Sequence, residues 1–243
     1  MRIDVLTIFP QMFSGFLTES IIKRAIEKGS LEVNLIDFRE FSNNKHHKVD
    51  DYPYGGGQGM VLRVEPIFNA LQSIEGYESA LKVMMSPQGE PYKQAKAEEL
   101  SKIEHMIIFC GHYEGFDERI RSLVDIEVSI GDYVLTGGEL GSMVLIDSVA
   151  RLLGDVLGNE MSHMEDSFSN GLLEGPQYTR PVEFNGMKVP EVLTSGHHKN
   201  IEDYRKFESI KRTLLRRPEL LNELSIEEET ILKMVKKSLD LNK

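Results

Sequence analysis

The sequence has one cysteine among 243 residues, which excludes an internal disulfide and a cysteine-rich zinc site. Cys110 ends an apolar run, 106–110, which favours a buried hydrophobic role for its thiol. No apolar run approaches the roughly 18–20 residues that a membrane span needs. The N-terminus becomes polar too early for a signal peptide. We therefore expect a cytoplasmic protein.

Several common catalytic motifs are also missing. There is no G-x-G-x-x-G between a first strand and its helix, and no G-x-x-x-x-G-K-[ST] phosphate loop. Neither a G-x-S-x-G elbow nor an H-E-x-x-H pair occurs, and we find no internal repeat. A dinucleotide site, a phosphate-loop nucleotide hydrolase, a serine hydrolase and a zincin are therefore unsupported.

Positive charge is scarce overall, because 28 Lys and Arg oppose 39 Asp and Glu for a net charge of −11. This balance argues against a broad surface that coats nucleic acid. Seven basic residues nevertheless gather between positions 197 and 218. They are Lys199, Arg205, Lys206, Lys211, Arg212, Arg216 and Arg217. A helix that holds phosphates and an ordinary solvated helix face both remain open interpretations.

The N-terminal two-thirds of the chain alternates strand-like and helix-like patterns. Strands are predicted at 3–8, 31–38, 81–85 and 106–110, and helices at 13–28, 66–74, 93–103 and 138–153. Repeated βα units predict an α/β fold with a mainly parallel sheet covered by helices. The helix 138–153 has little polar surface, so we expect it to be packed on most sides.

The pattern changes near Gly154. Residues 154–173 lack periodicity, as in a mobile linker, and 182–186 and 190–193 are short and irregular. Two amphipathic helices follow at 201–217 and 226–239. We predict a domain at 1–157, a flexible linker at 158–173 and a small helical domain at 174–243.

Four turns rich in glycine and polar residues adjoin apolar runs and are candidates for a ligand site. They are the segments 54–60, 86–89, 111–119 and 130–139. The second and third directly follow predicted strands, so they belong at the carboxyl edge of the sheet, where α/β proteins bind ligands. The fourth precedes a helix N-terminus, where unpaired N–H groups collect.

Together these segments resemble the bacterial tRNA (guanine-N1)-methyltransferases, which modify guanine 37 beside the anticodon and belong to the SPOUT superfamily. The likeness covers nearly the whole chain in order, including Ile3–Phe9, Asp50–Met60, Ser129–Glu139, Asp166–Pro181 and Val189–Ile201. The resemblance implies a SPOUT-type sheet with a deep trefoil knot, followed by a small C-terminal helical domain that binds tRNA.

The resemblance also implies an S-adenosylmethionine site built from three loops. The first loop supplies Met85, Ser86, Pro87 and Gly89, and the second supplies Gly111, Tyr113, Glu114 and Gly115. The third supplies Ile130, Gly131, Asp132, Tyr133, Val134, Leu135, Gly137 and Gly138. Backbone N–H and C=O groups suit the adenine edge, and Ile130, Tyr133 and Leu135 supply apolar walls.

Transfer of a methyl group to guanine N1 needs a base that removes the N1 proton and a cation that stabilises charge on O6. The resemblance assigns the base to Asp166 and the cation to Arg151. Without it, a surface acid in a loop and a helix salt-bridge arginine are the simpler interpretation. A base on a flexible loop also suits closure over a flipped guanine.

Contacts to tRNA are expected at two groups of residues. The glycine-rich turn offers Gly55, Gly56, Gly57 and Gly59, and the C-terminal domain offers Glu174, His198, Arg212, Arg216 and Arg217. His46 and His47 could bind a metal, but adjacent histidines in a polar loop are more often incidental. For His197 and His198, a position at the start of a helix is the simpler explanation. The resemblance further implies a homodimer with composite active sites and a use of magnesium, for which no site can be named.

Two positions depart from the family pattern. His112 stands where the family often has arginine, and Glu174-Gly-Pro-Gln replaces Asp-Cys-Pro-His. Three alternatives are a SPOUT methyltransferase for another RNA site, a non-catalytic RNA-binding protein with this fold, and a small-molecule methyltransferase. The segment 166–181 favours methylation of guanine N1. The C-terminal helical domain with its basic helix disfavours a small-molecule methyltransferase. The sequence does not indicate the preferred tRNA isoacceptors.

Overall fold

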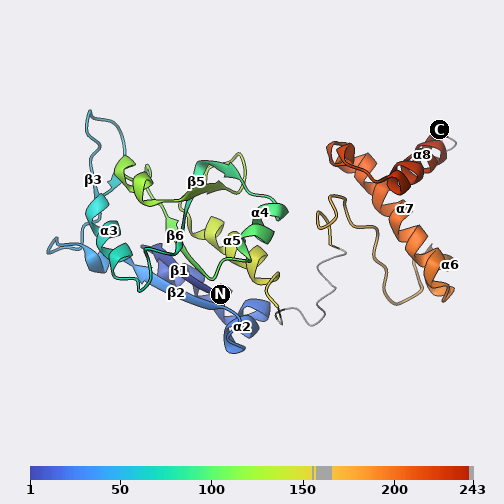
Figure 1. The fold of residues 1–243 in the computed structure, drawn as a ribbon, viewed down its shortest axis with the longest axis horizontal. Coiled ribbons are helices and arrows are strands. Elements are labelled where there is room, and N and C mark those ends of the chain that lie inside the picture. Colours follow the sequence, from blue (N-terminus) through green and yellow to red (C-terminus); the bar gives the residue numbers. More distant parts are fainter. Residues whose placement is uncertain (155, 157–165, 241–243) are drawn as a thin grey trace. The chain divides into compact units, whose positions relative to one another are not determined.

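The chain divides into two compact units, Met1–Glu160 and Met161–Lys243, in a computed structural model that describes residues 1–154, 156 and 166–240. The predicted linker therefore falls partly outside the described residues, which resume at Asp166. Figure 1 labels the main helices and strands of each unit. None of the described helices is long and apolar enough to cross a membrane.

The first unit is built on a five-stranded parallel sheet with strand order β2-β1-β6-β5-β7. The strands are β1 (Arg2–Thr7), β2 (Glu32–Asp37), β5 (Leu81–Pro91), β6 (His105–Cys110) and β7 (Ile126–Ser129). A mainly parallel α/β sheet was predicted, and this prediction is confirmed. The trefoil knot stays a prediction.

Both faces of the sheet are covered because side chains alternate along each strand. In β6, Met106 and Ile108 face a core shared with α2 (Ser20–Glu27) and α5 (Glu139–Ala150). Ile107 and Phe109 face the opposite core, shared with α3 (Val64–Gln72). Figure 1 shows α3 on the other side of the sheet from α2 and α5.

The remaining elements of this unit are short. They are the α-helices α1 (Ser14–Thr18) and α4 (Gln94–Leu100), the 3-10 helices η1 (Pro10–Phe13), η2 (Phe38–Phe41) and η3 (Glu118–Leu123), and the paired strands β3 (Asp50–Asp51) and β4 (Val61–Leu62).

Two predicted elements differ from the observed ones. The single helix at 13–28 is wrong: the chain breaks between α1 and α2, where Glu19 is extended and Ser20 has a φ of 55°. The strand predicted at 81–85 continues to Pro91, with Met85 and Glu90 both opposite Val128. Residues 86–89 therefore bulge out of a continuing strand and do not simply follow its end.

Helix α5 is buried along one side but not all round. Leu145, Ile146 and Val149 are fully buried, whereas Leu140 and Val144 are 49% and 46% exposed. These two residues are four apart, so they form one apolar stripe. Seven of the twelve residues of α5 are buried, so the helix is packed on most sides, as expected, except along this stripe.

The second unit is a small helical assembly. It contains α6 (Glu191–Thr194), α7 (His198–Arg216), η5 (Pro218–Asn222) and α8 (Ile226–Asp240), with a core around Leu172, Ile210 and Val235. The two long amphipathic helices were predicted correctly. The segment predicted as irregular contains a hairpin, β8 (Glu183–Phe184) and β9 (Met187–Lys188), turning at Asn185 and Gly186 with φ of 52° and 79°.

Gly138 marks the closest approach between the start of α5 and the sheet. A Cβ at this residue would lie 2.8 Å from Cys110 Cα and 3.0 Å from Gly111 N. Because both neighbours are backbone atoms, Gly138→Ala should cost about 1–3 kcal/mol of stability. Urea unfolding measures this loss.

The matched control is Gly15→Ala. Gly15 lies in α1 with nothing within 4 Å of its hypothetical Cβ, and alanine should be neutral or stabilising by about 0.5–1 kcal/mol there. Equal stability changes in the two variants would contradict the packing argument.

Candidate active site

A cavity of about 420 Å³ lies at the carboxyl edge of the sheet, where three loops meet. The loops follow or interrupt β5, β6 and β7 and comprise residues 85–89, 111–116 and 130–138. Parallel strands place these loops at one edge, as the sequence analysis expected. The volume is in the range of small-molecule sites.

Most residues expected at the cofactor site line this cavity. The lining includes Met85, Ser86, Pro87, Gly111, Tyr113, Glu114, Gly115, Ile130, Gly131, Tyr133, Val134, Leu135, Gly137 and Gly138. Gly89 and Asp132 do not line it. Gly89 instead packs against the β7 backbone at Val128, and Asp132 is exposed.

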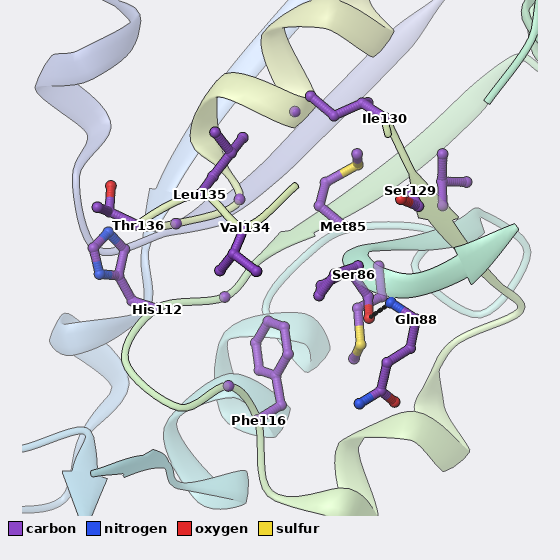
Figure 2. Close-up of a pocket in the computed structure, with 18 of the residues that line it drawn as sticks. Met85, Ser86, Gln88, His112, Phe116, Ser129, Ile130, Val134, Leu135 and Thr136 are labelled. Carbon is purple, nitrogen blue, oxygen red and sulfur yellow. Dashed lines mark hydrogen bonds between the residues drawn. The ribbon is translucent and has the colours of Figure 1, made fainter. Parts of the chain in front are cut away.

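Apolar side chains and backbone groups make up the walls. Figure 2 shows Met85, Val134 and Leu135 among the residues around the cavity. Ser86 Oγ accepts a hydrogen bond from Gln88 N at 3.2 Å, which stabilises the bend of the first loop. This combination suits a ligand with one flat apolar part and several hydrogen-bonding edges.

The second and third loops are tied together by backbone contacts. Gly138 N donates to Gly111 O at 2.9 Å, and His112 pairs with Gly137 in an antiparallel bridge. The second loop is also joined to the exit of the glycine-rich turn, because Glu114 N donates to Met60 O at 3.0 Å. The turn 55–59 is thus held beside the site, although none of its residues lines the cavity.

Several lining residues were missed by the sequence analysis, among them Gln88, Phe116 and Arg121. Arg121 donates to Gln88 Oε1 at 2.9 Å and pairs with Glu127 and, at 3.0 Å, with Glu118. The hydrogen bond to Glu127 is the main cause that raises the pKa of Arg121. No sequence pattern links positions 88 and 121, so only the fold reveals this support of the first loop.

Cys110 lies beneath the loops as a buried residue, which confirms the role predicted for it. Burial raises the pKa of its thiol, and the hydrogen bond that the thiol donates to Ser142 Oγ at 3.3 Å opposes this shift. A thiol held protonated is a poor nucleophile, so Cys110 is a packing residue.

The expected catalytic pair is divided between the two units. Arg151 is the C-cap residue of α5, and Asp166 opens the described part of the second unit. Both side chains are partly buried, and both have interactions with other residues. Ser167 Oγ accepts a hydrogen bond from Glu174 N at 3.0 Å, which links the segment after Asp166 to Glu174.

The basic residues of α7 are in different environments. Arg212 Nη1 donates to the carbonyl oxygens of Glu174 and Gly175, each at 3.1 Å. Arg217 pairs with Glu219 and lies 5.8 Å from the ring centroid of Phe168. His198 and Arg216 are exposed. Of these four residues, His198 and Arg216 are the ones without a side-chain hydrogen bond or ion pair in the described part of the chain.

Metal ligands do not cluster in the described parts of the chain. No group of three or more His, Cys, Asp and Glu side chains is placed there to hold an ion. His47 Nδ1 lies 3.1 Å from Arg39 O, a structural contact within its own loop. No step of the chemistry below is therefore assigned to magnesium.

Comparison with known proteins adds the family context. Residues 1–223 match the family "tRNA (Guanine-1)-methyltransferase TrmD". Three similar proteins are each named tRNA (guanine-N(1)-)-methyltransferase. They come from Geobacillus kaustophilus (62% identity over 225 residues, 92% of each chain), Halalkalibacterium halodurans (59% over 242 residues, 98% of each) and Staphylococcus carnosus (55% over 242 residues, 98% of this chain and 99% of the relative).

Proposed function

Because the chain belongs to the tRNA (guanine-1)-methyltransferase family, we propose that it methylates guanine 37 of tRNA in the cytoplasm, with Asp166 and Arg151 as catalytic residues. As a member of this family it is an S-adenosylmethionine-dependent tRNA (guanine-N1)-methyltransferase. The observation that carries the proposal is the three-loop cavity, which gathers 14 of the expected cofactor residues at one sheet edge.

The cavity fits the cofactor. S-adenosylmethionine, when bound, supplies an electrophilic methyl group. Leu135 and Ile130 are suited to enclose its apolar parts, and the backbone of the second and third loops offers hydrogen-bonding groups to its polar edges.

Guanine N1 carries a proton at neutral pH and attacks a methyl group poorly in that form. We assign Asp166 as the general base that takes this proton, and Arg151 as the cation that stabilises negative charge on O6. The family membership supports this assignment; Arg151 directly follows α5, and Asp166 lies in the second unit.

We further propose a homodimer in which the cofactor loops of one subunit act with Asp166 of the other. The exposed stripe formed by Leu140 and Val144 supports this, since α5 presents apolar surface that the described part of the first unit leaves uncovered. A second copy of the chain is the partner of matching chemistry.

Asp166→Asn should lower the single-turnover rate of methyl transfer by roughly 10²–10⁴-fold, because the amide cannot accept the N1 proton. Cofactor affinity, measured by calorimetry, should be unchanged. Ser167→Ala is the matched control, since it removes the acceptor for Glu174 N but leaves the carboxylate. A rate near wild type in Asp166→Asn would refute the assignment.

Arg216→Gln should weaken tRNA binding and reduce the salt slope of log Kd by about one, as expected when one phosphate contact is lost. Arg212→Gln should instead lower the melting temperature, because Arg212 ties α7 to the carbonyls of Glu174 and Gly175. Filter binding at several salt concentrations and thermal denaturation separate the two effects. An unchanged salt slope in Arg216→Gln would mark α7 as a solvated surface.

Asp166→Ala and Gly137→Trp should complement each other in a mixed dimer. The bulky side chain blocks the cavity, because even a Cβ at Gly137 collides with His112 and Glu139. One of the two sites then combines intact loops with an intact Asp166, so the isolated heterodimer should regain about half of wild-type activity.

Differently tagged subunits allow that heterodimer to be purified and assayed. A dimer of two differently tagged Asp166→Ala chains is the control and should stay inactive. An inactive but folded heterodimer would mean that each site is built within one chain.

A further inference from the structure

The side chain of Glu139 is buried at the start of α5, beside the cavity. Its Oε1 accepts a hydrogen bond from Thr7 Oγ1 at 2.7 Å. Its Oε2 is buried and has no hydrogen-bond partner among the described residues. Leaving a buried acceptor without a donor is unfavourable, so a side chain that supplies one is expected nearby.

The side chain that faces this oxygen is His112. Its Nε2 lies 3.7 Å from Glu139 Oε2, slightly beyond hydrogen-bond distance. The bridge between His112 and Gly137 fixes the backbone, and Gly137 has no side chain that would separate the imidazole from the carboxyl group. A small rotation of the ring therefore closes the hydrogen bond.

His112 also belongs to a row of rings at the edge of the cavity. Its ring centroid lies 4.7 Å from that of Phe9 and 5.8 Å from that of Tyr113, both with edge-on geometry. Phe9 and Tyr113 are 38% and 53% exposed. Figure 2 shows the imidazole at the border of the cavity, beside Thr136. Exposed aromatic rings of this kind are suited to contact RNA bases.

We propose that Glu139 is a positioning residue for this reaction. It accepts the Nε2–H of His112, and this fixes the tautomer in which Nδ1 is an acceptor. Nδ1 then accepts a hydrogen bond from an amino or hydroxyl group of the tRNA substrate at the aromatic row. This inference rests on the proposed function, since it requires that the target nucleotide enters beside the cavity.

Glu139→Gln tests the tautomer without removing bulk. Thr7 still donates to the amide oxygen, so the amide NH₂ turns towards His112 and favours the opposite tautomer, in which Nδ1 carries the proton. The KM for tRNA at saturating S-adenosylmethionine should rise roughly tenfold, as for the loss of one hydrogen bond. Cofactor affinity and melting temperature should change little.

Two variants of His112 distinguish the roles of its two ring nitrogens. His112→Gln places an amide near Nε2 and should raise the KM for tRNA as Glu139→Gln does. His112→Asn keeps an acceptor near Nδ1 but loses the contact to Glu139, so adding Glu139→Gln should change nothing further. Thr7→Val removes the hydrogen bond from Thr7 to Glu139. It replaces Glu139→Gln in this test if Glu139→Gln folds poorly.

Asp4→Asn is the matched control. Asp4 Oδ2 lies 2.6 Å from His105 Nε2 at the amino end of β6, far along the strand from the cavity. This variant should lower stability and leave the KM for tRNA unchanged.

A KM for tRNA within twofold of wild type in Glu139→Gln, or additive effects of Glu139→Gln and His112→Asn, would overturn the proposal. If the wild-type protein transfers no methyl group to guanine 37, the proposed function fails instead. Equilibrium tRNA binding by the same variants would still decide the role of Glu139.

Discussion

The close approach of Gly138 to the end of β6 is the constraint on which the site depends. The hydrogen bond from Gly138 N to Gly111 O joins the second and third loops and sets where α5 begins. It thereby fixes the position of Glu139, the next residue, whose side chain accepts a hydrogen bond from Thr7 of β1. The hydrogen bond between Thr7 and Glu139 joins elements that are 132 residues apart in the sequence.

Much of the first unit was predictable because short runs of strand-forming residues mark its strands. A β-rich run indicated β1, alternation indicated β2 and an apolar run indicated β6, and the parallel arrangement put their loops at one edge. The place of the cavity at this edge could be predicted for the same reason. The bulge at 86–89 could not, since it depends on how Gly89 packs against β7, a strand 37 residues further on.

Other features could not be predicted from the sequence because they depend on contacts between residues that are far apart in the chain. Arg121 supports Gln88, and Arg212 supports the carbonyls of Glu174 and Gly175, yet each reads as an ordinary basic residue. The break at Ser20 was hidden by regular apolar spacing on either side. The Asn185-Gly186 hairpin had a recognisable turn signal, and this one could have been found.

The basic residues of α7 show why counting charges overstates an RNA-binding surface. Lys206 pairs with Glu202 and Glu227, and Lys211 pairs with Glu208. Arg217 also pairs with Glu219, so several of these positive charges are already neutralised within the second unit. On a chain with a net charge of −11, long-range attraction to tRNA is therefore weak. Recognition is then expected to rely on a few well-placed contacts and on the shape of the site, and the contact that we propose for His112 and Glu139 is of this kind.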